Sequence, residues 1–204
     1  NLPAVDVGGT PFKVIASAGH NCVLLTDRSL RCWGLNTWGQ VGSDAGANTP
    51  GVASCSGPFD CIGDEPGEMG LVLPAPLGPA TVARLAVAYR HTCALTTVDL
   101  VKCWGTNEQG QIGIEDNAAD NLYIGDQPGE MATLRLIQAI PLKPGKTLEE
   151  FTAGGFHTCA VNTDGSMNCW GWNADGQLGH GTTTNWGDTP GEMGPGLPDT
   201  VLDP

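Results

Sequence analysis

Apolar positions in this chain come in short runs that alternate with turns rich in Gly, Asp and Asn. In residues 151–179, FTAGGFHTCAVNTDGSMNCWGWNADGQLG, two such runs flank the tripeptide Thr163-Asp164-Gly165. A three-residue loop with Gly in the last position is typical of a β-hairpin. Almost everywhere, Gly or Pro interrupts the spacing that an amphipathic helix needs. The pattern therefore predicts short strands joined by tight turns and an all-β fold.

The same stretch occurs three times. Residues 15–42 and 85–113 repeat the order of apolar, His-x-Cys, Cys-Trp-Gly and Gly-Gln positions that is found in residues 151–179. A period of this size indicates a solenoid or a propeller. Because each unit holds four strand-like runs, we predict β-propeller-type repeats that form three four-stranded blades.

The predicted boundaries follow from the repeat. They are residues 1–13 for a connecting strand that completes a blade, 14–84 for blade repeat 1, 85–150 for blade repeat 2, and 151–204 for blade repeat 3 with a C-terminal strand at the same phase. Arg28 and Asp99 stand where the third copy has Gly165. We therefore expect less ideal or differently built turns in the first two copies.

Six of the eight cysteines form three pairs with the same spacing. Each pair is symmetric about its predicted hairpin turn, so the two sulfur atoms face each other across neighbouring strands. Zinc sites favour CxxC spacing with converging histidines, so we predict one hairpin disulfide inside each blade. The remaining two cysteines lie in a loop that only the first repeat has. The predicted disulfide cysteines are Cys22 with Cys32, Cys93 with Cys103, Cys159 with Cys169, and Cys55 with Cys61.

The cysteines and the charge together limit the class of protein. Disulfides persist in oxidising compartments, so we expect an extracellular, cell-surface or periplasmic protein. The net charge is −13, with only 9 Lys and Arg, which argues against a nucleic-acid partner. No apolar run approaches the about 18 residues that a membrane helix needs, so we expect no membrane span.

The small residues before His-x-Cys-Ala and the following Cys-Trp-Gly-x-Asn-x-x-Gly-Gln-Leu-Gly resemble the repeat of the regulator-of-chromosome-condensation family. The resemblance implies propeller blades of four antiparallel strands, usually about seven to a ring. The paired cysteines resemble the secreted bacterial branch of that family. Its eukaryotic namesake binds chromatin and exchanges guanine nucleotide on a small GTPase, and another bacterial relative inhibits β-lactamases. This acidic, cystine-rich chain departs from the chromatin-binding type, so the resemblance does not transfer that activity.

A second element, Asp-x-Pro-Gly-Glu-Met, recurs near the end of each unit and is called the marker below. Its carboxylate pairs are Asp64 with Glu68, Asp126 with Glu130, and Asp188 with Glu192. Calcium binds oxygen ligands of the kind that these carboxylates and loop carbonyls supply, so calcium is the one cofactor that the sequence suggests. The alternative is a structural turn in which the carboxylates accept hydrogen bonds from backbone N–H groups.

No set of residues with a recognisable catalytic spacing occurs. The motif histidines His20, His91 and His157 repeat in register, so we expect a structural hydrogen bond inside each blade. Three loop tryptophans, Trp38, Trp172 and Trp186, either form a recognition surface or lie buried under the insertions. We therefore expect a binding or assembly protein and not an enzyme.

Three blades are fewer than a ring normally needs, and an open arc exposes apolar blade faces at both ends. A fragment of a longer protein, half of a six-bladed ring and a head-to-tail stack are the three alternatives. Similar segments flank the first and last units, which favours an extracellular assembly protein that self-associates head to tail, as a filament or a completed ring. The expected interface residues are Leu2, Val5, Val7, Leu197, Val201, Leu202, Trp38, Trp172 and Trp186. The alternative function is a secreted recognition module that binds a protein or a glycan through its variable blade loops.

Overall fold

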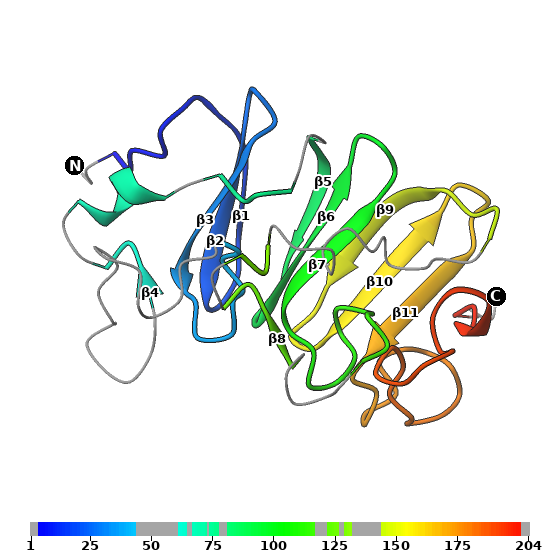
Figure 1. The fold of residues 1–204 in the computed structure, drawn as a ribbon. Coiled ribbons are helices and arrows are strands. Elements are labelled where there is room, and N and C mark those ends of the chain that lie inside the picture. Colours follow the sequence, from blue (N-terminus) through cyan, green and yellow to red (C-terminus); the bar gives the residue numbers. More distant parts are fainter. Residues whose placement is uncertain are drawn as a thin grey trace.

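The chain forms three antiparallel sheets that follow one another along the sequence (Figure 1). The computed structural model describes residues 4–43, 61–64, 67–72, 74–77, 81–116, 122–126, 129–131 and 144–200. The strands are β1 (Pro11–Ala16), β2 (His20–Leu25), β3 (Leu30–Leu35), β4 (Cys61–Ile62), β5 (Val82–Val87), β6 (His91–Thr96), β7 (Val101–Thr106), β8 (Tyr123–Ile124), β9 (Leu148–Ala153), β10 (His157–Asn162) and β11 (Met167–Gly171). The 3-10 helices are η1 (Glu68–Leu71) and η4 (Gly194–Gly196). No helix in the described part of the chain is long and apolar enough to span a bilayer.

Each sheet is one blade, in which strands that are neighbours in space are also neighbours in the sequence. The orders are β1-β2-β3-β4, β5-β6-β7-β8 and β11-β10-β9. The prediction of an all-β protein with three propeller blades is confirmed. The fourth strand is short in the first two blades. In the third it is reduced to a single bridge between Gly171 and Trp186. The first strand of each sheet begins three residues before the predicted boundary, at Pro11, Val82 and Leu148.

One disulfide joins the two central strands of each blade. Cys22–Cys32, Cys93–Cys103 and Cys159–Cys169 are each directly opposite pairs in the antiparallel ladder, with Cα atoms 4.1 Å apart. This separation is close to that of a non-hydrogen-bonded pair, in which side chains approach most closely. The three predicted hairpin disulfides are therefore present. Cys61 is also disulfide-bonded, and Cys55 lies outside the described residues.

The hairpin turns between these strands are built alike in all three blades. Arg28 and Asp99 adopt φ values of 67° and 57°, in the left-handed region where Gly165 has 82°. Of the two alternatives expected for these turns, a different build was wrong, whereas a less ideal turn agrees with a left-handed residue that is not glycine. A side chain in this conformation costs about 1–2 kcal/mol. The paired strands on either side hold the turn in place, so the first two blades carry this cost without a change of turn type.

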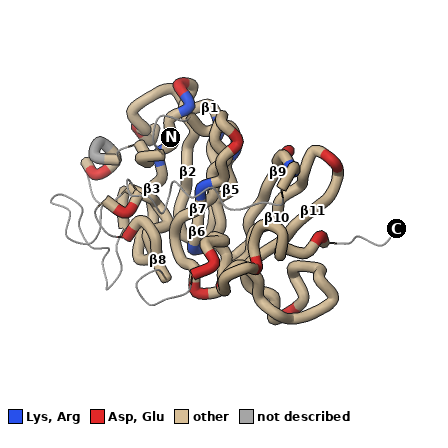
Figure 2. The backbone as a smooth tube through the Cα atoms, turned by 45° about the vertical axis from the view of Figure 1, so that its right-hand side comes forward, with Lys and Arg blue, Asp and Glu red and all other residues tan. Residues whose placement is uncertain are grey.

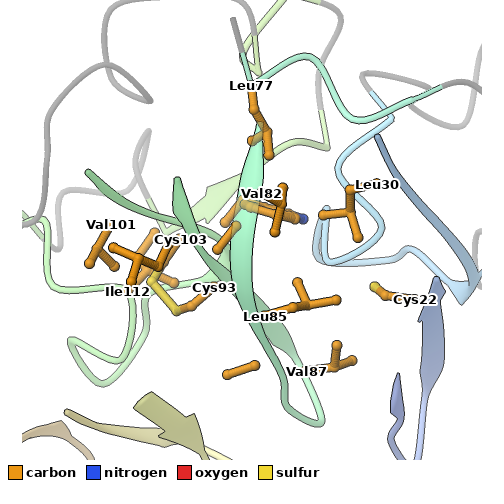
Figure 3. Packing of buried hydrophobic residues seen from close by; sticks show 14 of the residues in the cluster. Cys22, Leu30, Leu77, Val82, Leu85, Val87, Cys93, Val101, Cys103 and Ile112 are labelled. Atoms are coloured by element: carbon orange, nitrogen blue, oxygen red, sulfur yellow. A yellow bond between two sulfur atoms is a disulfide. The ribbon is translucent and has the colours of Figure 1, made fainter. Parts of the chain in front are cut away.

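The main hydrophobic core lies between the blades and runs through all three of them. Figure 3 shows β5 between Leu30 and Cys22 of the first blade and the Cys93–Cys103 disulfide of its own blade. Leu85 on β5 is 5% exposed because the preceding blade covers it. Since each sheet buries one face against the next sheet, the stability of a blade depends on its neighbours.

A hydrogen-bonded network joins the first blade to the second. Nε2 of His20 lies 2.6 Å from Oγ1 of Thr92, and this hydroxyl donates to the backbone carbonyl of Gln40 at 2.8 Å. The indole N–H of Trp104 donates to the same carbonyl at 3.0 Å. All four side chains are fully or almost fully buried. The other ring nitrogen of His20, Nδ1, lies 3.3 Å from Oγ of Ser17. The first motif histidine therefore makes the expected bond inside its own blade and also reaches across to the next blade.

The same network joins the second blade to the third. Nε2 of His91 lies 2.9 Å from Oγ1 of Thr158, which donates to the carbonyl of Gln111 at 2.9 Å. The indole N–H of Trp170 donates to this carbonyl at 3.1 Å. The repeat therefore encodes the contact between successive blades as well as the blade itself.

Burial of these imidazoles makes the fold sensitive to acid. Desolvation lowers the pKa of His20 to about 4 and that of His91 to about 3, so both rings are neutral in the folded protein at neutral pH. In the unfolded chain a histidine titrates near pH 6.5, so the unfolded state binds more protons below that pH. The contribution of these two neutral histidines to the free energy of unfolding is therefore fully present above pH 6.5. It is lost as the pH drops toward the folded-state pKa values.

We expect the substitution His91→Gln to remove part of this pH dependence. An amide retains a donor for Thr158 but does not titrate. Between pH 7 and pH 5 the variant should lose roughly 2 kcal/mol less free energy of unfolding than the wild type. Urea unfolding at several pH values measures the difference. The half-buried His157 is the control, because His157→Gln should alter the pH dependence less. Equal effects of the two substitutions would contradict this account.

Candidate functional site

The marker is a turn held by its own glutamate. A carboxylate oxygen of Glu68 accepts hydrogen bonds from the backbone N–H groups of Gly63 and Asp64, at 2.8 and 3.2 Å. In the second blade Glu130 accepts from the N–H of Gly125 at 2.9 Å. Glu192 does the same in the third blade, accepting from Gly187, Asp188 and Thr189. This arrangement matches the structural alternative for the marker.

The third marker also brings two carboxyl groups together. Burial raises the pKa of Asp188, and the adjacent Glu192 raises it further. Burial acts in the same direction on Glu192, but hydrogen bonds from Thr189 and its neighbours outweigh it and lower the pKa of that carboxyl. Within the described residues, no group of three or more His, Cys, Asp or Glu side chains converges as metal ligands do. Calcium binding at the markers stays a prediction of the sequence.

The marker turn packs on the preceding blade. A Cβ atom added to Gly39 would lie 2.5 Å from the backbone nitrogen of Asp126, and one added to Gly110 would lie 2.6 Å from that of Asp188. A Cβ added to Gly176, at the same position of the third blade, would meet nothing within 4 Å. In the first two blades, the glycine of the Asn-x-x-Gly-Gln turn is therefore required for close contact with the next blade.

Substitution of two of these glycines by alanine should separate the cost of disturbing the contact between blades from the cost of backbone strain. Gly110 and Gly176 have φ values of 78° and 77°, so alanine pays the same conformational cost at both positions. Gly110→Ala must also displace the turn of the next blade, which we expect to cost about 1–3 kcal/mol more. Chemical unfolding of the two variants measures this difference. Similar losses of stability would show that the glycines serve only the local turn.

Four aromatic side chains from all three blades form one row, which we call the aromatic row: Trp38, Tyr89, Phe156 and Trp172. The ring centroids of consecutive members are 6.1, 6.2 and 5.9 Å apart, and the last two pairs are edge-to-face. The row lies at the end of the blades where β2, β6 and β10 begin and β3 and β11 end. All four side chains are half-buried, so each ring keeps an accessible surface.

Arg90 is held in the middle of the aromatic row. Its guanidinium carbon lies 4.0 Å from the ring centroid of Trp38, 5.1 Å from that of Phe156 and 5.4 Å from that of Tyr89. Cations are attracted to aromatic faces at such distances. Glu108 lies 3.5 Å from the guanidinium. One guanidinium therefore contacts three of the four rings.

Glu108 links the row to Tyr123 on β8. The hydroxyl of Tyr123 donates to Glu108 at 3.1 Å. Burial, the bond to Glu108 and the nearby charge of Asp126 raise the pKa of Tyr123. Asp and Glu lie on loops of all three blades, whereas Lys and Arg are few (Figure 2).

The structure separates the three loop tryptophans that the sequence grouped together. Trp38 and Trp172 join the aromatic row. Trp186 instead packs against the core, pairs with Gly171 and meets His180 edge-to-face at 5.8 Å. The structure therefore places two of the three tryptophans on a shared surface and one within the third blade.

The other expected interface residues lie near the ends of the described chain. Val5 is 58% exposed, while Val7 is buried on Val23 and Leu25 and Leu197 is buried in the core. Leu2, Val201 and Leu202 lie outside the described residues.

Sequence reasoning missed Tyr89, Arg90 and Phe156. They occupy the two positions before the motif histidine, where the three copies have Ala18-Gly19, Tyr89-Arg90 and Gly155-Phe156. Variation at these positions inside a constant motif was the available signal. It could not reveal that residues of different copies meet, because this depends on the way successive blades are placed side by side.

Comparison with known proteins identifies the three motif copies as a known repeat. The model described as "Regulator of chromosome condensation (RCC1) repeat" matches residues 13–40, 82–111 and 150–177. The ultraviolet-B receptor UVR8 of Arabidopsis thaliana is 26% identical over an alignment of 222 residues, gaps included, and the match covers 91% of this chain and 47% of that protein. The X-linked retinitis pigmentosa GTPase regulator of Mus musculus is 25% identical, over 88% of this chain and 15% of its own length. This chain thus spans less than half of either relative.

A solved structure shows the same fold. Prp20p from Saccharomyces cerevisiae, which was studied with its binding to Gsp1p and histones, superimposes with a TM-score of 0.60 at 15% identity. The match covers 94% of this chain and 38% of Prp20p.

Proposed function

Because this chain is built from RCC1 repeats that fold as propeller blades, we propose that it acts by binding another protein through the aromatic row and not by catalysis. The observation that carries the proposal is the row itself. Residues such as Trp, Tyr and Arg dominate the energy of protein interfaces when they lie in a rigid, partly desolvated cluster. Prp20p, whose fold is the same, was studied with its binding to Gsp1p and histones, which supports protein binding as the class of activity.

An extracytoplasmic location is part of this proposal. Seven of the eight cysteines lie in the described residues, and all seven are disulfide-bonded. Reducing compartments keep such thiols free, so the bonds support a secreted, surface or periplasmic protein.

Paired variants test the binding proposal. The double substitution Phe156→Ser and Trp172→Ser removes half of the row, and Val98→Ser alters a 58% exposed residue at the hairpin tip of the second blade. Proteins captured by wild type from an extracellular fraction should be captured equally by Val98→Ser and lost with the double variant. With a purified partner we expect at least a ~30-fold weaker Kd, as for hot-spot residues. Unchanged capture and affinity would refute a role for the row.

A second candidate function is self-association of the blades head to tail. One observation favours it: an apolar position that is buried between blades inside the chain is exposed on the outer face of the first blade. Val14 on β1 is 64% exposed, whereas Leu85 and Phe151 at the same repeat position are 5% and 4% exposed. Val14 thus leaves exposed an apolar position that the other two blades bury against a preceding blade. Light scattering over a range of concentrations tests the proposal, and a chain that stays monomeric at all of them contradicts it.

A further inference from the structure

Inside the chain, successive blades are joined by what we call the contact set: the histidine, glutamine carbonyl and turn glycine of one blade meet the threonine, tryptophan and marker of the next. The outer face of the third blade carries the first half of this set. His157 and Gln177 are half-buried, whereas His20, His91, Gln40 and Gln111 are at most 1% exposed. Among the described residues, nothing donates to the Gln177 carbonyl and nothing bonds to the His157 ring. Gly176, beside them, is the one turn glycine of its kind in the described chain on which no marker packs.

The outer face of the first blade carries the other half of the contact set, which includes the tryptophan and the marker. Trp33 occupies the position of Trp104 and Trp170 but is half-buried, while those two indoles are 0% exposed. Val7 and Met69 cover part of this face, over Val23 and Leu25. The edge strand β1, with Val14, stays exposed beside them.

We propose that the outer face of the third blade binds the outer face of the first blade in a second copy of this chain, with the contact set of the interior interfaces. This inference rests on the self-association proposed above and assigns its residues. The indole N–H of Trp33 would donate to the Gln177 carbonyl, as Trp104 donates to Gln40. The marker turn at Gly63 and Asp64 would pack on Gly176.

Asn21 fits the remaining position, where the other blades have threonine. At the interior interfaces the threonine hydroxyl has two roles, because it pairs with a histidine nitrogen and donates to a glutamine carbonyl. A side-chain amide performs both, since Nδ2–H donates to the Gln177 carbonyl while Oδ1 accepts from Nε2–H of His157. The two faces are therefore chemically complementary even though their sequences differ.

The two faces are different surfaces of the chain, so the contact is heterologous. Such a contact propagates into a filament or closes into a ring. In either case, one blocked face still leaves the opposite face of the same copy free to bind. This property separates the proposal from a symmetric dimer.

Two charge substitutions and their mixture test the inference. Val14→Glu blocks the face of the first blade, and Thr152→Glu blocks that of the third, where exposed Thr152 pairs with Cys159. Both side chains are already exposed, so neither substitution should prevent folding. Val98→Glu at a hairpin tip is the matched control, because Val98 is also exposed, by 58%.

Light scattering should show assemblies for the wild type and for Val98→Glu, and 21.1 kDa monomers for each blocked variant alone. An equimolar mixture of the two blocked variants should give particles of two chains, joined by their intact faces. A wild type that is monomeric overturns both self-association and this inference. Assembly that either blocked variant retains, or a mixture that stays monomeric, overturns the inference and leaves self-association in place.

Discussion

Replacement of Trp104 by alanine should destabilise the protein by about 3–5 kcal/mol, the range for loss of a buried aromatic side chain. The indole is 0% exposed, lies between the first and second blades, and donates to the Gln40 carbonyl at 3.0 Å. Alanine leaves a cavity between the sheets and a buried carbonyl with one donor fewer. Chemical unfolding followed by circular dichroism measures the loss of free energy.

The matched control is Trp33→Ala, which changes the same repeat position in the first blade. Trp33 is half-buried and makes no hydrogen bond with its indole in the described chain. We expect its replacement to cost less than half as much when the measurement is made on the monomer. If the two substitutions cost the same, the stability of a blade does not depend on its contact with the preceding blade.

The blades could be predicted from the sequence because their determinants are local. The cysteine pairs are symmetric about a short turn, so Cys159 and Cys169 could face each other in only one hairpin register. The conformation of the turn at Arg28 was predicted less accurately, because the paired strands and not the residue itself impose its left-handed conformation. The short fourth strands depend on a few pairings after variable loops, and the sequence pattern does not mark them.

The contacts between blades could not be predicted, because they join residues that are far apart in the chain. His20 meets Thr92 across 72 positions, and the side chains on each side of this contact are ordinary members of their own repeats. The sequence predicted a structural role for the motif histidines, but their partners depend on the placement of one sheet beside another. The same reason explains why Tyr89 and Phe156 were not foreseen in the aromatic row.

Reduction of the disulfides should unfold the chain, and this is the largest effect that we expect. Each hairpin disulfide closes a loop with a sequence separation of 10. In the chain-entropy model a loop of this size contributes roughly 3 kcal/mol, so the three together contribute roughly 9 kcal/mol. Domains are typically stable by about 5–15 kcal/mol in total, so loss of all three bonds removes most or all of that margin.

The disulfides also link stability to the proposed compartment. A chain that needs them would not keep its fold in a reducing cytosol, whereas it would in an oxidising space. Tryptophan fluorescence and far-UV circular dichroism at 37 °C, before and after complete reduction confirmed by thiol titration, measure the effect. Re-oxidation should restore the signal. The double substitution of Cys93 and Cys103 by serine provides an intermediate case, with an expected loss of about 3 kcal/mol. A fully reduced chain with an unchanged thermal midpoint would show that packing between the blades alone holds the fold and would remove this support for an extracytoplasmic location.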